Sequence, residues 1–152
     1  MSETVRLLVA DGVPDSPARV DAPTRRPFRI GAVQHRWHRD PAEHTAALAE
    51  GVRMAAGEGA ELVCLQELTL SPYFCSRPDV PDALERFGED LESGPTITFA
   101  RAAAARHQIV VHASLYERTP DGHGYNTAIC VDPSGALLAR TRKTHIPAFP
   151  WY

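Results

Sequence analysis

The stretch Glu61-Leu-Val-Cys-Leu-Gln-Glu-Leu-Thr-Leu-Ser-Pro-Tyr-Phe-Cys75 decides the fold predicted for this chain. Its residues 62–65 form an apolar run that is short enough for a strand buried on both faces, as in α/β proteins. The run ends on Gln66 and Glu67, and Ser71-Pro72 then turns the chain. Glu67 is thus expected at the C-terminal end of a buried strand, where α/β folds often place their chemistry. A solvated glutamate fits the same position, so Glu67 needs a partner before it indicates a site.

Composition indicates one globular unit without a basic surface. The 152 residues are 43% hydrophobic and 23% charged, and the formal net charge is -3. This charge argues against nucleic acid and membrane surfaces as partners. No apolar stretch is long enough to span a bilayer, and the first residues do not resemble a secretory signal. Three cysteines without CxxC spacing suggest neither a disulfide framework nor a metal site, so a cytoplasmic location is expected.

Residues 1–27 are predicted to be a mobile N-terminal extension, and the domain is expected to cover residues 28–152. Prolines, aspartates and arginines dominate the extension and leave it little to bury. Its apolar piece, Val5–Ala10, has the composition to dock on a partner subunit.

The domain begins with a predicted β-α-β unit. In the first strand, residues 28–34, alternation places Phe28, Ile30 and Ala32 on one face. Asp40 and Pro41 are a capping residue and a first helical residue, so a helix is expected to follow them. The apolar face of this helix holds Leu48, Val52, Ala55 and Ala56, and glycines 57 and 59 end it. The buried strand at 62–66 completes the unit.

The remaining elements predict a mixed sheet with helices on one face. They are a short helix near 83–87, a helix over 95–107, a strand over 109–115, and a hairpin of strands over 125–132 and 136–143. Asp132-Pro-Ser-Gly135 fits the type I turn of that hairpin.

Alternation along the last strand draws attention to Lys143. One face holds Leu137, Ala139, Thr141 and Lys143, and the other holds Arg140 and Arg142. We interpret the arginine face as the wet one, which leaves Lys143 at the end of the buried face. A lone ammonium there either reaches water along its own stem or meets an anion. Glu67, also at a strand end, is the candidate anion, and a Glu–Lys pair beside a cleft is typical of functional sites.

Several ordered motifs resemble the nitrilase superfamily of carbon–nitrogen hydrolases, over residues 28–152. They are Ala32–Gln34, Leu65–Leu68 with Pro72–Cys75, Leu115–Arg118, Tyr125–Ala128 and Arg142–Pro147. The wording LQEL…PYFC with RKTHIP is most similar to the N-carbamoylputrescine amidase branch, with β-ureidopropionase close by. This wording favours carbamoyl-polyamine chemistry without defining the substrate.

The resemblance implies an α-β-β-α sandwich of the nitrilase type that forms homo-oligomers and uses a Glu-Lys-Cys set with neither metal nor organic cofactor. By position, Glu67 would be the general base and Lys143 would stabilise the oxyanion. The implied substrate is a small linear amide or an N-carbamoyl amine. Three further residues are candidates to support the pair, each with a structural alternative. They are Glu117 (or a solvated loop carboxylate), Asn126 (or a polar residue near a turn) and His145 (or a structural group).

The sequence departs from the family pattern after the lysine motif. In the family the nucleophilic cysteine lies on a later strand, whereas this sequence ends at Tyr152, and Trp151 stands where relatives commonly have glycine. The chain therefore resembles the N-terminal half of such a domain, incomplete at the C-terminus. Cys64 and Cys130 fit strand interiors, and the PYFC motif accounts for Cys75, so none is taken as the nucleophile. Two hypotheses follow: part of a working amidase, or a catalytically inactive half-domain that acts as an interaction or remnant protein.

Overall fold

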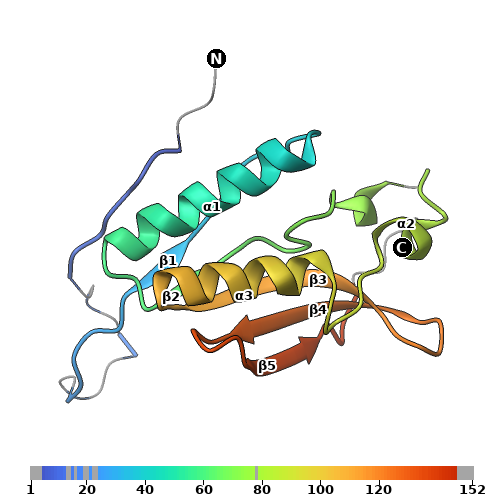
Figure 1. The fold of residues 1–152 in the computed structure, drawn as a ribbon. Coiled ribbons are helices and arrows are strands. Elements are labelled where there is room, and N and C mark those ends of the chain that lie inside the picture. The colour runs from blue at the N-terminus through green and yellow to red at the C-terminus, as the bar shows by residue number, and fades with distance from the viewer. Residues whose placement is uncertain are drawn as a thin grey trace.

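A five-stranded mixed sheet forms the centre of the computed structural model, which describes residues 5–12, 15, 17–18, 21, 24–77 and 79–146. The strands are β1 (Ile30–Ala32), β2 (Leu62–Cys64), β3 (Val110–Arg118), β4 (Gly124–Val131) and β5 (Leu137–Arg142), and their order in the sheet follows the sequence. β1, β2 and β3 pair in parallel, whereas β3, β4 and β5 pair antiparallel. Helices α1 (Pro41–Gly57) and α3 (Pro95–His107) cover one face of the sheet (Figure 1). The mixed α/β architecture predicted from the sequence is confirmed.

Helix α1 begins and packs as its sequence predicts. The Asp40 carboxylate accepts the backbone N–H of Ala42 at 2.7 Å and of Glu43 at 3.3 Å, which satisfies donors that the first helical turn leaves free. Leu48 and Val52 are wholly buried against the sheet. Close approach to β1 is possible because Gly51 presents no side chain to Val33.

Helix α3 is capped from a distance. Its N-cap residue is Gly94, which has no side chain to offer, and the buried carboxylate of Glu89 accepts the Thr96 N–H and hydroxyl instead, each at 2.8 Å. Ile97 and Ala100 are fully buried in the core between the helices and the sheet. The short helix α2 (Ala83–Phe87) and a single 3₁₀ turn at Phe74–Ser76 lie in the connection between β2 and α3.

The second face of the sheet carries no helix in the described part of the chain. Gly31 faces Ala55 of α1, so Ile30 points away from the helices, and Ile30 is 59% exposed. Leu62 and Val110 lie beside Ile30 in register and are half-buried. The next cross-strand row consists of Ala32, Cys64, His112, Cys130 and Ala139. We call the face defined by these two rows the open face.

Two sequence expectations about strand faces need correction. The face of Arg140 and Arg142, predicted to be the wet one, is the helix-covered side, where they pair in register with the buried Ile129 and Thr127. Both arginines still reach water at the edge of that side, with side chains 47% and 35% exposed. Leu137 does not share the face of Lys143, because a register shift between Cys130 and Val131 puts it opposite Val131. Lys143 therefore belongs to the open face and not to a buried one.

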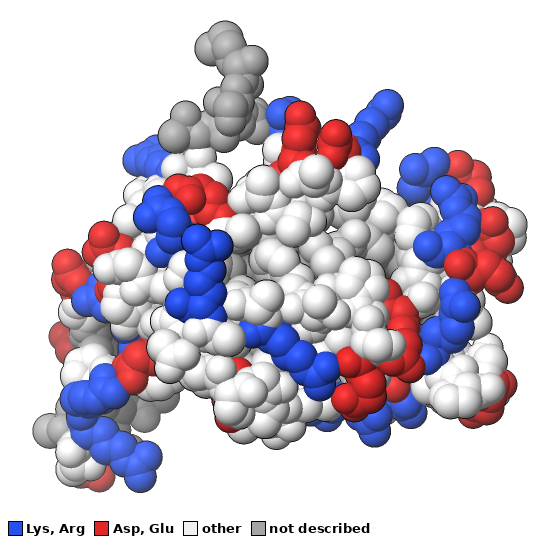
Figure 2. Space-filling model, viewed as in Figure 1, with Lys and Arg blue, Asp and Glu red and all other residues white. Residues whose placement is uncertain are grey.

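The amino-terminal segment is described only in part. Residues 5–10 run as coil beside β1 and the second half of α1, and the Arg29 guanidinium lies 2.9 Å from the Asp11 carboxylate. The other residues of the predicted extension lie partly outside the described ranges, and its mobility stays a prediction. Among the described residues, no helix is both long and apolar enough to cross a membrane. Both signs of charge surround the helix-covered face, and no extended patch of one sign covers it (Figure 2).

Candidate active site

Glu67 sits on a tight turn immediately after β2. The turn is tied to β3, because the Thr69 N–H donates to the Ser114 carbonyl at 2.8 Å and the Ser114 N–H donates to the Thr69 hydroxyl at 3.0 Å. Leu68 adopts φ of 53°, which is unusual for a residue with a side chain, and it is almost fully buried. The apolar run and the following turn, predicted from the sequence, thus present the Glu67 carboxylate at a strand end.

The structure brings Glu67, Lys143 and Asn126 together. Glu67 Oε1 accepts a hydrogen bond from Lys143 Nζ at 2.9 Å and another from Asn126 Nδ2 at 2.6 Å. Asn126 lies on β4, and Lys143, just past β5, is fixed beside it because its backbone N–H donates to the Asn126 carbonyl at 2.8 Å. The paired side chains of Glu67 and Lys143 are 38% and 35% exposed. Together they form a charged cluster at the end of the open face.

Opposing effects act on the pKa of Glu67, and the hydrogen bonds prevail. Burial alone would raise the pKa, but donors on Lys143, Asn126 and Tyr73 stabilise the carboxylate, so the pKa lies below the ordinary value for glutamate. The group is therefore ionised at neutral pH. Tyr73 belongs to the PYFC motif, but its hydrogen bond to Glu67 could not be predicted from that motif.

Burial has the largest effect on the pKa of each of the three cysteines. Burial, followed by the charge of Glu67, raises the pKa of Cys75 above its ordinary value, although Lys143 acts in the opposite direction. Burial also raises the pKa of Cys64 and of Cys130. All three thiols are free. A raised pKa keeps a thiol protonated and weakly nucleophilic.

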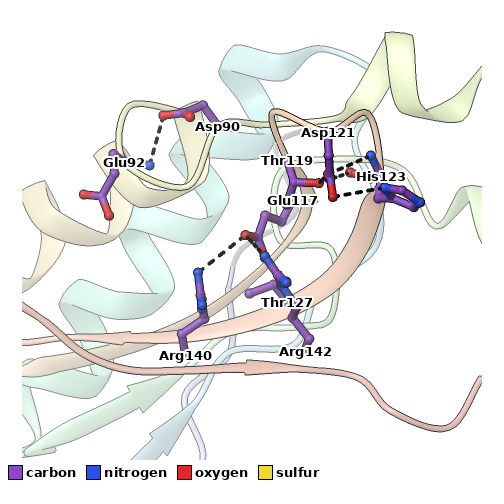
Figure 3. Close-up of polar contacts among 9 residues, drawn as sticks. All are labelled: Asp90, Glu92, Glu117, Thr119, Asp121, His123, Thr127, Arg140 and Arg142. Atoms are coloured by element: carbon purple, nitrogen blue, oxygen red, sulfur yellow. Dashed lines mark hydrogen bonds and ion pairs between the residues drawn. The ribbon is translucent and has the colours of Figure 1, made fainter.

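Glu117 is a buried partner of the arginines, not a solvated loop carboxylate or a direct partner of Lys143. Its carboxylate lies on the helix-covered side of β3 and is 4% exposed. Arg142 binds it with Nε at 2.9 Å and an amino nitrogen at 2.7 Å, and the Thr127 hydroxyl donates at 2.7 Å (Figure 3). A guanidinium nitrogen of Arg140 lies 3.7 Å from Glu117 Oε1. Alternation along the strand explains this outcome, since Arg142 and Lys143 are neighbours that point to opposite faces.

The candidate His145 and the buried His44 have different environments. His145 lies in the exposed segment after β5, and the hydrogen bonds that the structure describes for Glu67 do not include it. His44, which the sequence reading did not single out, is wholly buried and its Nε2 lies 2.9 Å from the Thr69 carbonyl. The rings of His35 and Trp37 pack against the His44 ring at tilted angles, with centroid distances of 4.8 Å and 4.1 Å. Among the described residues, no three histidine, cysteine or acidic side chains are arranged to hold a metal ion.

The mixed α/β fold of this chain is the fold of a known hydrolase family. Residues 29–151 match the family model described as carbon-nitrogen hydrolase, and the chain belongs to this family. The nitrilase-type resemblance seen in the motifs is thereby confirmed.

Several relatives within this family are named N-carbamoylputrescine amidase. N-carbamoylputrescine amidase of Arabidopsis thaliana is 30% identical over 128 residues, which cover 84% of this chain and 42% of the relative. Beta-ureidopropionase of the same plant is 33% identical over 102 residues, or 61% of this chain and 23% of the relative. A carbon-nitrogen hydrolase from Helicobacter pylori G27 has the same fold with a TM-score of 0.70 and 30% identity, covering 79% of this chain and 40% of that one. The chain thus spans about two fifths of its amidase relatives.

Proposed function

We propose that the whole protein is an amidase that hydrolyses the C–N bond of an N-carbamoyl amine or a small linear amide. The observation that carries this proposal is the contact of Lys143 Nζ with Glu67 Oε1 at 2.9 Å, at the end of the open face. In the proposed mechanism Glu67 is the general base and Lys143 the oxyanion stabiliser. The nucleophilic cysteine is supplied by a part of the protein beyond residue 152.

The first half of the reaction needs an ionised carboxylate beside a thiol. Glu67 takes the thiol proton while sulfur attacks the amide carbon, which breaks the carbonyl π bond and forms a tetrahedral oxyanion. The hydrogen bonds that lower the pKa of Glu67 keep it ready for this step at neutral pH. Glu67 then returns its proton to the leaving nitrogen, and ammonia or an amine departs.

The second half repeats the same proton transfers with water. Glu67 accepts a proton from a water molecule that attacks the thioester, and the thiol leaves with that proton restored. Lys143 provides a fixed positive charge where negative charge develops in both halves, an arrangement worth on the order of a few kcal/mol of barrier. Asn126 holds the Glu67 carboxylate by its 2.6 Å hydrogen bond.

The named activities of the relatives favour a carbamoyl or simple amide substrate over a peptide. The two plant relatives are called N-carbamoylputrescine amidase and beta-ureidopropionase. We extend the proposal to a cytoplasmic homo-oligomer, in keeping with the resemblance drawn from the motifs. The alternative hypothesis is an inactive half-domain that binds another chain. The exposed apolar residues of the open face support it, because such a surface is typical of protein–protein contacts.

Ammonia release from N-carbamoylputrescine and from small linear amides tests the proposal. We expect the full-length gene product to turn over at least one of these substrates. Glu67→Gln should lower kcat by about 10³-fold or more, because it removes the base while keeping the shape of the side chain. Glu50→Gln, at an exposed pair with Arg53 on α1, is the matched control and should leave kcat unchanged.

The described residues also predict the behaviour of residues 1–152 expressed alone. Their cysteines have raised pKa values, so this segment should release no ammonia. Turnover by residues 1–152 that disappears on Cys75→Ala would make Cys75 the nucleophile. Full activity of Glu67→Gln in the full-length product would remove the general-base assignment.

A further inference from the structure

The Ser114 hydroxyl joins two parts of the candidate site that are distant in sequence. Ser114 lies on β3 and is 4% exposed. Its Oγ accepts the backbone N–H of Leu68 at 3.2 Å and donates to Asn126 Oδ1 at 3.4 Å. A serine hydroxyl has one proton to donate, so this pair of contacts uses the donor and one acceptor position.

The contact with Asn126 supports the orientation in which the amide meets Glu67. A carboxylate only accepts hydrogen bonds, so the amide must present its NH₂ group and not its oxygen. Because Ser114 donates to Oδ1, the amide oxygen has a partner on the side away from Glu67, and Nδ2 is left to donate to Glu67 Oε1. Without the hydroxyl, the amide in this set of contacts is held by its bond to Glu67 alone, and its oxygen loses the partner on the other side.

The contact with Leu68 stabilises the unusual peptide next to Glu67. Leu68 follows Glu67 directly and has φ of 53°, a conformation that persists only when its surroundings enforce it. Three backbone and side-chain contacts of Ser114 enforce it, through Leu68 N–H, Thr69 N–H and the Thr69 hydroxyl. The Thr69 hydroxyl in turn donates to the Gln66 carbonyl at 2.9 Å, which closes the turn around Glu67.

We propose that Ser114 is a positioning residue for Glu67, acting through the Asn126 amide and the Leu68 peptide. The inference rests on the proposed function, since it concerns the base of that reaction. Ser114 touches no reacting atom. It fixes where the carboxylate lies and which donors it meets, and so maintains the hydrogen bonds that keep Glu67 ionised.

The test compares Ser114→Ala with wild type in the full-length gene product. We expect kcat to fall about tenfold with KM within about twofold, because the base is displaced while substrate binding is kept. The acid limb of the kcat/KM profile should move up by about half a pH unit, the size expected for weakening one neutral hydrogen bond to a carboxylate. Ser134→Ala is the control, since that hydroxyl serves the remote β4–β5 turn through Asp132.

A second readout does not depend on activity. The infrared carboxylate band that Glu67→Gln removes identifies Glu67, and its titration should shift to higher pH in Ser114→Ala. In an Asn126→Ala background the same substitution should add little to the shift, because the amide that Ser114 orients is gone. Ser114→Thr keeps the hydroxyl and should titrate as wild type. If Ser114→Ala does not fold, Ser114→Cys, with its weaker donor, should give a smaller shift in the same direction.

The outcomes separate this inference from the proposed function. A lower melting temperature with an unchanged acid limb and an unchanged Glu67 titration would overturn it and leave Ser114 a structural residue. Equal shifts in the Asn126 and Asn126→Ala backgrounds would also overturn the route through the amide. If instead Glu67→Gln keeps full activity, the proposed function itself fails, and the Ser114 measurements are not needed to see it.

Discussion

At the residue scale, two glutamates on opposite faces of the same sheet have different environments. Glu67 is half-exposed and bound by a lysine, an amide and a phenol, whereas Glu117 is buried and bound by Arg142 and Thr127. The Glu67–Lys143 pair reaches solvent, whereas the Glu117 side chain is 4% exposed. Glu117 on β3 contacts Thr127 of β4 and Arg142 of β5, and so holds the three strands together.

Loss of the Glu117 charge should lower the free energy of unfolding. Glu117→Gln leaves the Arg142 guanidinium, which is 35% exposed, without the buried carboxylate that binds it through two nitrogens, so it should lower the free energy of unfolding. Urea unfolding of the full-length product at pH 7 would measure it. The exposed pair Glu50–Arg53 is the matched comparison, and Glu50→Gln should change the free energy of unfolding much less, because solvent screens that pair. Equal costs for both variants would contradict the buried-pair argument.

The same carboxylate predicts a pH dependence of stability. Hydrogen bonds from Arg142 outweigh burial and lower the pKa of Glu117 below its ordinary value. Since the folded pKa is the lower one, the stabilisation is complete above the unfolded value of about 4.3 and is lost as pH falls through the folded pKa. Below pH 5, the free energy of unfolding of Glu117→Gln should therefore fall less steeply with decreasing pH than that of the wild type, as urea unfolding at several pH values would show.

Sequence reasoning reached Glu67 and Lys143 but misjudged their surroundings. Period-two alternation placed Lys143 and Arg142 on opposite faces, which is what the structure shows. It could not say which face the helices cover, because Arg142 reads as a surface residue until its buried anion is known. Tyr73, Ser114 and His44 were missed since their roles depend on contacts between segments far apart in the chain.

At the element scale, α1 approaches β1 through glycines. A Cβ on Gly51 would lie 2.6 Å from Val33 Cγ1, and a Cβ on Gly31 would lie 2.7 Å from Ala55 Cβ. Both contacts are too short for real atoms, so the two elements meet at a distance that only glycine permits. The helix and its cap were predictable from Asp40 and the apolar spacing. The close approach was not, because Gly51 within a helix only indicates a weaker helix.

Alanine at position 51 should therefore destabilise the protein although alanine favours helices. The added methyl group would force Val33 from the core at a cost of about 1–3 kcal/mol, which exceeds the helix-propensity gain of about 1 kcal/mol. Gly57 is the matched control at the end of the same helix, with nothing within 4 Å of an added Cβ, so Gly57→Ala should be neutral or stabilising. Thermal unfolding of both variants gives the comparison, and a stabilising Gly51→Ala would contradict the packing.

At the scale of the whole molecule, the helix layer and the sheet form a core with one covered and one open face. Element types were predictable throughout because each has its own period and its own turn or cap signals. The sequence did not predict which face of the sheet the apolar residues of the first strand occupy. Phe28 and Ile30 share a face as expected, yet both are more than half exposed, since the core lies under Gly31 and Val33. The candidate site stands at the end of that same open face.

The open face predicts how residues 1–152 behave without the rest of the protein. One apolar row of the open face, formed by Ile30, Leu62 and Val110, is unfavourable to expose to water. In addition, β1 has an unpaired edge within the described sheet. We expect this segment to self-associate and bind a hydrophobic dye, as judged by sedimentation velocity and dye fluorescence. Ile30→Lys should reduce both, because it places a charge on the row, whereas Leu8→Lys, at an exposed apolar residue outside the sheet, should change neither. A segment that stays monomeric and dye-free would mean that the open face is stable in water. The inactive half-domain hypothesis would then lose the surface proposed for binding another chain.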